Sequence, residues 1–452
     1  MGSGGDMRAQ AISYRARKIW RTDGPLLDNG AVACRDGRIA EIAPWTEVRD
    51  KKAETVDLGD VLLLPGLVNA HTHLRLTHLK GKIAPTKNFV GWLGKIALRS
   101  KLSRRTTLQR SIWAGARELL QGGVTTAVEL DVDGLSTETL RDSPLRLIFA
   151  HECIDLNPAR AEKTASKLME TIARYEAEPL RRQHGIAPHA PYSVSRELWE
   201  ALARKGGQVG NLSRDGQESV ARKSGSATAG KDFVRRVANL SYFWTIHISE
   251  SADEVEMFTE GRGRMVRWLR MFGVLPRGWK APHCTPVAFL EQTGILATPG
   301  IAAHCGCVAE ADAAILARCG WTVAFCPGTH EYFKRPPYPL ELLRRAGVHV
   351  CIATDSAASN TGLNMMEELR RLARMFPELS AAEIIAAATT IPAQAIGWGR
   401  DIGRIESGCC ADFSAWSPCG DGVRLDRSWL GNPAPTCTAT IIAGEIVARQ
   451  TA

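Results

Sequence analysis

Hydrophobic positions in the central part of the chain follow two alternating patterns. Eight short apolar runs, bounded by Gly, Pro and polar residues, have the length and composition of buried strands. They are Leu67–Ala70, Thr125–Leu130, Leu145–His151, Gly185–Pro188, Phe243–His247, Ile301–His304, Thr322–Cys326 and His349–Ala353. Between several of them apolar residues recur at helical spacing, as in Thr107–Gln121, Ala159–Ala177 and Asn364–Met375. Strands that alternate with helices form parallel sheets. The pattern therefore predicts the α/β class and a distorted (β/α)8 barrel over residues 66–400.

The two ends of the chain are rich in short strand-like segments separated by turn signals such as Asp36-Gly37 and Ala443-Gly444. The candidates are Ala11–Tyr14, Gly30–Cys34, Arg38–Ile42 and Val61–Leu64 near the start, and Gly403–Gly408, Ala411–Trp416 and Thr438–Val447 near the end. We therefore expect residues 1–65 and 401–452 to build one small β-sandwich domain together.

Composition narrows the class of protein. Hydrophobic residues make up 44% of the 452 positions and charged residues 23%, which is typical of a globular protein and excludes disordered and fibrous classes. No apolar run approaches the ~20 residues that span a bilayer. The first twenty residues lack the apolar core of a secretory signal, and the twelve cysteines form no C-x-x-C pair. We expect a cytoplasmic protein with reduced thiols and no membrane partner.

One basic segment interrupts the barrel pattern. Residues 205–241 are rich in Gly, Ser, Lys and Arg, and the stretch 205–236 carries seven of the basic and three of the acidic side chains, or +4 of the net charge of +9. An insertion in the barrel is the favoured interpretation, ahead of a substrate lid. Binding of nucleic acid through this segment is a third option that predicts strongly salt-dependent affinity, and we do not expect it.

Metal-binding side chains gather at the ends of the predicted strands. His71 and His73 follow the first strand, and their spacing of two directs both imidazoles to one side of an extended segment. His189, His247, His304 and Asp355 also fall at or just past strand ends. In a barrel those ends form a single rim, where neutral imidazole and carboxylate suit Zn²⁺ or Fe²⁺. Burying so many polar groups without partners would cost several kcal/mol, so the pattern indicates a site.

Glu250 lies three residues after His247 in His247-Ile248-Ser249-Glu250. A carboxyl at this position could move a proton near neutral pH if burial raises its pKa. Standing alone, it would read as a solvated glutamate at the start of a helix. His78, His151, His184, His283 and His349 are interpreted as structural or surface histidines.

Several motifs in order resemble one family of enzymes. They are Pro65–His73, His189-Ala190-Pro191-Tyr192, His247-Ile248-Ser249-Glu250, Ala303-His304-Cys305, Thr354-Asp355-Ser356, and Gly403–Gly408 with Ala411-Asp412. The set resembles the amidohydrolase superfamily, and within it the mononuclear deaminase and chlorohydrolase branch. The resemblance covers nearly the whole chain apart from residues 205–241.

The resemblance implies one divalent metal ion, Zn²⁺ before Fe²⁺, held by His71, His73, His247 and Asp355. Binuclear relatives bridge two metals through a lysine on the fourth strand, and the fourth strand here has none and ends in His189. Such a metal lowers the pKa of bound water from ~16 toward ~7. Asp355 would accept the water proton, His304 would orient the water, and Glu250 would protonate a ring nitrogen before ammonia leaves.

The implied activity is hydrolytic deamination of an aminated N-heterocycle. His189, Glu250, Trp92 and His330 are the expected substrate contacts. For Trp92 a place in the core is an equally good interpretation. His330-Glu331-Tyr332-Phe333 with Pro336-Pro337 and Ala358-Ser359-Asn360 resembles deaminases of aminofutalosine-type nucleosides, which are related to those of adenosine and S-adenosylhomocysteine.

Two alternatives stay open within this fold. A chlorohydrolase that removes halide from a triazine-like ring would share the fold, although Glu250 favours departure of an amine. A catalytically impaired binding relative would lack a ligand, and none is missing. The substrate is in each case a small molecule, and the β-rich ends could supply the surface of a homodimer.

Overall fold

The computed structural model describes residues 12–22, 24–48, 54–206, 242–419, 427–431 and 434–449. Most of the predicted insertion 205–241 lies outside the described residues, and so do the hypotheses attached to it. The boundaries predicted at residues 65 and 400 stay predictions.

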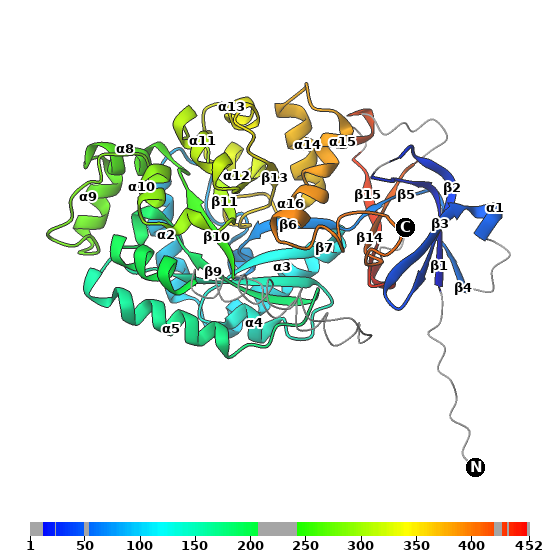
Figure 1. Cartoon of the computed structure of the whole chain (residues 1–452), viewed down its shortest axis with the longest axis horizontal. Helices are drawn as coiled ribbons and strands as arrows, with labels where there is room; N and C mark the ends of the chain where they lie inside the picture. Colours follow the sequence, from blue (N-terminus) through cyan, green and yellow to red (C-terminus); the bar gives the residue numbers. More distant parts are fainter. Residues whose placement is uncertain are drawn as a thin grey trace, which may run out of the picture.

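Eight parallel strands form the barrel that the alternating pattern predicts (Figure 1). They are β6 (Leu67–Thr72), β7 (Val124–Asp131), β8 (Arg146–Cys153), β9 (Arg182–Pro188), β10 (Phe243–Ile248), β11 (Ile301–His304), β12 (Thr322–Phe325) and β13 (Val350–Ile352), hydrogen-bonded in chain order. An isolated parallel bridge between Thr72, the last residue of β6, and Asp355, just beyond β13, brings the first and last strands together. The Asp355 amide donates to the His71 carbonyl at 3.1 Å. The eight strands expected from the sequence are confirmed.

Helices surround the barrel, and their buried faces carry the predicted periodicity. In α3 (Arg105–Gln121) Leu108, Ile112, Ala116 and Leu119 are all buried. The other long helices are α2 (Phe89–Leu102), α5 (Ala161–Ala173), α8 (Ala252–Glu260), α9 (Arg264–Met271), α11 (Glu310–Arg318), α14 (Met365–Met375) and the helical residues 196–206. Shorter ones are α1 (Trp45–Val48), α4 (Leu135–Thr139), α10 (Pro286–Gln292), α12 (Pro327–Tyr332), α13 (Leu340–Arg345), α15 (Ala381–Ala386) and α16 (Thr390–Ala395). No helix in the described part of the chain combines the length and the hydropathy that a bilayer crossing requires.

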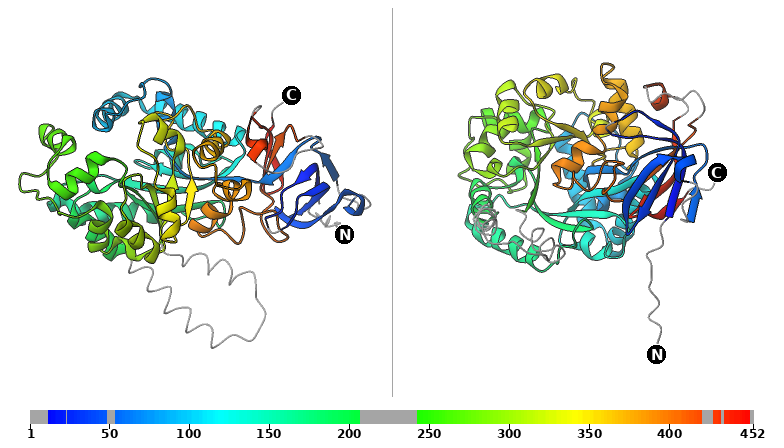
Figure 2. Two further views of the ribbon diagram at one scale, coloured as in Figure 1. Left: turned by 90° about the horizontal axis from the view of Figure 1, so that it is seen from above. Right: turned by 45° about the vertical axis from the view of Figure 1, so that its right-hand side comes forward.

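Segments from both ends of the chain build the second sheet, which lies beside the barrel (Figure 2). Its strands are β1 (Ile12–Ile19), β2 (Leu27–Arg35), β3 (Arg38–Pro44), β4 (Glu54–Asp57), β5 (Leu62–Pro65), β14 (Phe413–Ser417), β15 (Thr436–Ile442) and β16 (Glu445–Arg449). The order is β16-β15-β14-β5-β1-β2-β3, with β4 paired to β1. Tyr14, Ile39 and Ile441 share one core although their strands are far apart in this order, so the sheet curls around it.

One strand expected in this region is wrong. Residues 403–408 form no strand, because Gly403 and Gly408 both have positive φ angles, of 78° and 88°, which an extended strand does not allow. The segment instead crosses the edge of β3, where the Gly408 amide donates to the Ile39 carbonyl at 2.8 Å.

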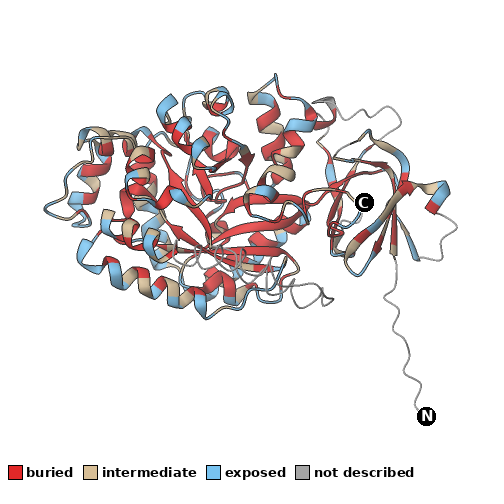
Figure 3. Ribbon diagram, viewed as in Figure 1, coloured by how far each residue is buried: buried red, intermediate tan, exposed pale blue. Residues whose placement is uncertain are grey.

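A buried ion pair joins the barrel to the second sheet. Arg146, at the start of β8, donates from Nε and Nη2 to the two carboxylate oxygens of Asp412, at 2.6 and 2.9 Å. The Asp412 carbonyl accepts from the Gly66 amide at 2.9 Å, just before β6. The barrel strands themselves are buried along almost their whole length (Figure 3), so the polar rim at their carboxyl ends stands out against an apolar interior.

Candidate metal and active site

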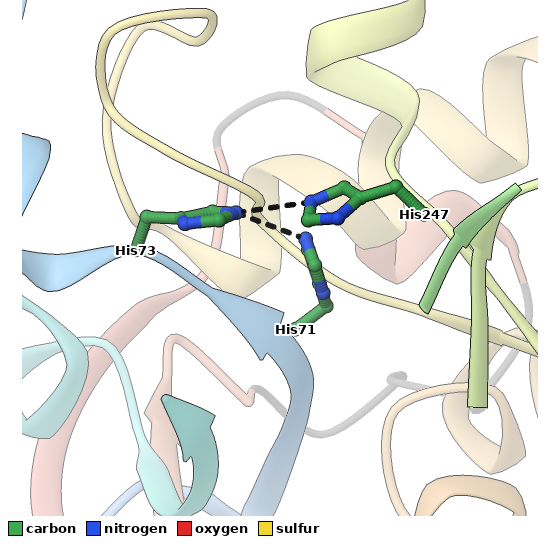
Figure 4. A group of neighbouring side chains, drawn as sticks. All are labelled: His71, His73 and His247. Atoms are coloured by element: carbon green, nitrogen blue, oxygen red, sulfur yellow. Dashed lines mark hydrogen bonds between the residues drawn. The ribbon is translucent and has the colours of Figure 1, made fainter. Parts of the chain in front are cut away.

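Three imidazoles converge at the carboxyl ends of the barrel strands (Figure 4). His71 lies in β6, His73 follows that strand, and His247 lies in β10. The Nε2 atom of His73 is 3.2 Å from Nε2 of His71 and 3.3 Å from Nε2 of His247. The i, i+2 spacing predicted that His71 and His73 point the same way, and barrel closure adds a histidine 174 residues further along the chain.

The tautomer of His247 is fixed by its backbone neighbour. Its Nδ1 lies 2.8 Å from the His189 carbonyl oxygen, which only accepts, so Nδ1 carries the proton and Nε2 presents a lone pair to the other two rings. Burial is also the main reason why the pKa values of His71 and His73 lie well below the usual range, with the neighbouring His247 adding to the effect. The rings of His71 and His73 are therefore neutral, which is the form that binds metal.

Asp355 follows β13, the last barrel strand in chain order, and lies beside the imidazoles. Its Oδ2 accepts hydrogen bonds from the hydroxyls of Thr329 and Ser359, both at 3.0 Å. Its Oδ1 is left facing the imidazoles, 3.8 Å from His71 Nε2 and 3.6 Å from His73 Nε2. Burial, assisted by the nearby Glu250 carboxylate, raises the pKa of Asp355 to about 6. The facing nitrogens of His71, His73 and His247 lie within 4.8 Å of one another, and an Asp355 oxygen lies within the same distance of nitrogens of His71 and His304. Imidazole nitrogens and a carboxylate oxygen are the donor types of a Zn²⁺ or Fe²⁺ site.

Glu250 and His304 lie beside this group. Glu250 follows β10 and His304 ends β11, and their Oε2 and Nε2 atoms are 3.8 Å apart. Burial, then the neighbouring His247 and Arg335, hold the pKa of His304 well below its usual range. Both backbone amides at the Ser249–Glu250 turn donate to the buried Glu254 carboxylate, at 3.1 and 2.8 Å, which fixes the direction in which Glu250 leaves the strand.

Arg335 is a member of the site that the sequence analysis missed. Its Nη2 donates to Oε1 of Glu250 at 2.8 Å, and only 9% of the Arg335 side chain and 6% of the Glu250 side chain are exposed. The guanidinium carbon lies 4.8 Å from the ring centre of Phe333 and 5.6 Å from that of Phe89. The available signal was a basic pair, Lys334-Arg335, directly before Pro336-Pro337 in the loop of the seventh strand.

A cavity of about 870 Å³ opens from these residues to the surface. His73, His247, Glu250, His304 and Asp355 line its inner end. The predicted substrate contacts His189 and Trp92 also line the cavity, and His189 Nδ1 is 2.8 Å from the Ser193 hydroxyl. Trp92 is buried and lies 5.1 Å from Phe333, centre to centre, so it packs in the core at the cavity wall; its contact with substrate stays a prediction.

Glu152, near the end of β8, lines the cavity and was not predicted from the sequence. Burial raises the pKa of its carboxyl to about 7. The rule that selected the histidines, a polar side chain at a strand end, would have selected Glu152 as well.

His330 does not join the cavity. It lies in α12, and its Nε2 donates to the Pro336 carbonyl at 2.7 Å while its ring packs against Phe325 and Tyr338. Burial lowers the pKa of His330 to about 4. In place of the expected substrate contact, His330 makes a hydrogen bond to Pro336 that holds the loop carrying Arg335.

The model of the amidohydrolase family matches residues 62–447. The chain belongs to the amidohydrolase family. The resemblance inferred from the ordered motifs is thereby confirmed, and the chain is a member of a family of hydrolases.

Among curated proteins, this amidohydrolase is 28% identical over 401 residues to 5-methylthioadenosine/S-adenosylhomocysteine deaminase of Desulforudis audaxviator, covering 86% of this chain and 80% of that protein. Two solved structures cover 97% of it with a TM-score of 0.76. One is an adenosine deaminase from Xanthomonas campestris with bound zinc, 24% identical and covered over 93%. The other is aminofutalosine deaminase of Helicobacter pylori with methylthio-coformycin, 19% identical and covered over 100%. At these identities the structures establish the fold.

Proposed function

We propose that this amidohydrolase is a metal-dependent hydrolytic deaminase of an adenine nucleoside derivative, of which aminofutalosine is one example. The observation that carries the proposal is the convergence of the imidazole nitrogens of His71, His73 and His247, with the Asp355 carboxylate, Glu250 and His304 beside them, on one cavity. The 5-methylthioadenosine/S-adenosylhomocysteine deaminase named above supports the substrate class.

His71, His73, His247 and Asp355 would hold the metal ion. A divalent cation at this position acidifies a water ligand and so provides a nucleophile at neutral pH. The Asp355 carboxylate, which would share the cation with that water, would accept the proton that the water loses.

Glu250 and His304 act on the substrate and the attacking water. The Glu250 carboxyl lines the cavity. In its protonated form it would transfer its proton to the ring nitrogen beside the amino-bearing carbon, which would make that carbon electrophilic. His304, held neutral by burial, orients the nucleophile by a hydrogen bond. The amino group then leaves as ammonia, and the ring becomes a lactam.

Release of ammonia from adenine nucleosides by the metal-loaded protein tests the proposal. We expect turnover of adenosine derivatives, one metal ion per chain, and a fall in kcat of about 10²–10⁴-fold in Glu250→Gln. Glu260→Gln, an exposed glutamate at the end of α8, is the matched control and should keep wild-type activity. Halide release from chlorotriazines without ammonia release would replace the proposal by the chlorohydrolase alternative. A metal-loaded protein that binds nucleosides without turnover would indicate a binding protein.

A further inference from the structure

Exposed apolar side chains gather around the opening of the cavity. Seven large apolar side chains are exposed in the described part of the chain, and six of them lie on segments that line the cavity. Ile154 and Val274 line it directly, so the cavity opens to solvent beside them. The other four, each between 59% and 73% exposed, are Leu98 and Leu102 in α2 and Met271 and Phe272 at the end of α9. A cluster of this kind on a surface marks an interaction site.

The exposed apolar side chains of α2 and α9 belong to one surface. Gly94 of α2 lies against the indole of Trp268 in α9, and a β-carbon at position 94 would be 3.4 Å from its Nε1. Leu98 is one turn beyond Gly94 in α2. Phe272 is one turn beyond Trp268, and the centres of these two rings are 5.4 Å apart. Both helices lie in the part of the barrel away from the second sheet (Figure 1).

The same two segments are strongly basic. Residues 80–104, which contain α2, include seven Lys or Arg and no Asp or Glu, and residues 261–280, which contain α9, include six and none. These thirteen charges exceed the net charge of +9, so the remainder of the chain is net acidic. Ion pairs with described carboxylates occupy three of the thirteen side chains, which are Lys80, Arg262 and Arg264. The surface around the opening therefore attracts anions.

Basic and apolar side chains are mixed on the same helix faces. One face of α2 carries, at spacings of three and four residues, Lys95, Leu98, Arg99 and Leu102. In α9 the exposed Arg267 and Arg270 lie beside the exposed Met271. Helices that lie on a phospholipid bilayer combine these two features, because their apolar side chains enter the acyl boundary while their basic side chains meet the headgroup phosphates.

We propose that this basic and apolar face of α2 and α9 docks on the anionic surface of a phospholipid bilayer, with the opening of the cavity turned toward the lipid. The contact is peripheral and needs no spanning helix. It departs from the sequence-based expectation that the protein has no membrane partner, because that expectation considered apolar runs and not the faces of short helices.

Two other polyanionic or apolar partners fit the face less well. Nucleic acid is bound at single strands by stacking on aromatic rings, and among the six exposed side chains only Phe272 is aromatic. A second copy that met this face with its own identical face would bring thirteen like charges toward thirteen others. A lipid surface supplies both the negative charge and the apolar layer beneath it.

Sedimentation with phospholipid vesicles tests the proposal without any substrate, so its outcome does not depend on the proposed function. We expect the protein to bind vesicles of phosphatidylcholine with about 30 mol% phosphatidylglycerol about tenfold or more tightly than vesicles of phosphatidylcholine alone. The difference should shrink as NaCl rises from about 50 to about 500 mM, because salt screens the headgroup charge. No binding, or equal binding to both kinds of vesicle at low salt, would overturn the proposal.

Variants of the face locate the contact. Arg99→Gln/Arg270→Gln should weaken binding to anionic vesicles by about fivefold for each charge removed. The matched control is Arg35→Gln/Arg449→Gln, which removes two exposed arginines of the second sheet and should bind like the wild type. Equal weakening in the two double variants would show that net charge, and not this face, causes the binding.

The apolar contribution is tested separately. Leu98→Ser/Met271→Ser should weaken binding to anionic vesicles by about tenfold or more, at high salt as well as at low salt, because insertion of apolar side chains is not screened. Thermal melts that match the wild type show that the variants are folded. Unchanged binding of this variant would contradict insertion and so overturn the proposal.

Two outcomes would assign the face to a different partner and so overturn the lipid assignment. One is displacement of the protein from anionic vesicles by an RNA of about 20 nucleotides at an equal concentration of phosphate, which would indicate a nucleic-acid site. The other is a dimer, detected by light scattering, that dissociates in Leu98→Ser/Met271→Ser, which would indicate a contact between two copies of the chain.

Discussion

At the scale of single residues, the Arg335–Glu250 pair sets the position of the proposed proton donor. Arg335 restrains Oε1, and Glu254 restrains the backbone, so Oε2 is the atom left to face His304 and the substrate. Removal of one partner from a buried ion pair is strongly unfavourable, because the charge of the other partner is then left buried without compensation.

We expect Arg335→Gln to lower kcat by about 10- to 100-fold with a smaller change in KM, because a poorly placed Glu250 affects the transition state more than substrate binding. The kcat of Arg335→Lys should lie between those of Arg335→Gln and the wild type, because lysine keeps the positive charge and loses the planar guanidinium. Steady-state kinetics on the metal-loaded proteins measure both constants. The exposed neighbour Lys334→Gln serves as the control. A change confined to KM would contradict a positioning role.

At the scale of elements, neighbouring strands β8 and β9 carry a pair of stacked imidazoles. His151 Nε2 lies 3.0 Å from His184 Nδ1, and both rings stack on Tyr175 at 5.3 and 4.9 Å between centres. Burial lowers the pKa of His151 to about 3 and that of His184 to about 4. Both stay neutral in the folded protein under conditions where an unfolded histidine is charged.

This pair predicts a loss of stability in acid. Below pH ~6.5 the unfolded chain binds protons on both histidines, and the folded protein does not until about pH 4 and 3. The free energy of unfolding therefore falls as the pH drops from 6.5 to 4. Between pH 7.5 and 4.5 the free energy of unfolding of His184→Gln should fall by about 2 kcal/mol less than that of the wild type. Urea unfolding at the two pH values measures both. The exposed His283→Gln is the control. An unchanged pH slope in His184→Gln would refute the assignment.

The pattern of elements explains which parts of the site the sequence predicts. Parallel strands place their carboxyl ends at one rim, so His71, His73, His247, His304 and Asp355 could be assigned from strand ends alone. The loop after β12 offered no such rule, because loop direction depends on contacts rather than on periodicity. For that reason His330 was expected in the cavity and Arg335 was overlooked.

At the scale of the whole molecule, the Arg146–Asp412 pair links the barrel to the sheet built from both ends of the chain. The two residues are 266 positions apart, so no local pattern could predict their contact. The sheet itself was predicted from turn signals at both termini, whereas β4 and the exact pairing depend on contacts with β1.

We expect Arg146→Met to reduce the free energy of unfolding by about 3–5 kcal/mol, because it leaves the Asp412 carboxylate buried and unpaired. Arg146→Met/Asp412→Leu should recover part of the loss. The exposed pair of Arg105 and Glu138 supplies the control, and Arg105→Met should cost less than about 1 kcal/mol. Denaturant titrations compare the four proteins. Equal losses in Arg146→Met and the double variant would show that the carboxylate is not the source of the cost.

Removal of the metal should destabilise the whole fold. The four proposed ligands come from β6, β10 and the end of β13, so a bound cation ties together three strands, including the first and the last. At a free metal concentration about 1,000 times the dissociation constant, binding adds about 4 kcal/mol to stability. Differential scanning calorimetry before and after chelation checks this, with His71→Asn as a variant that should gain little from added Zn²⁺. Equal melting temperatures with and without metal would contradict the ligand set.

The Thr72–Asp355 bridge also has a consequence for biosynthesis. The strands that it joins stand at opposite ends of the barrel sequence, so a ribosome must release the chain past residue 355 before the fourth ligand can meet the other three. If the four proposed ligands hold a cation together, it can be bound by all of them only after the last strand has docked, and the time course of metal capture during refolding would report that step.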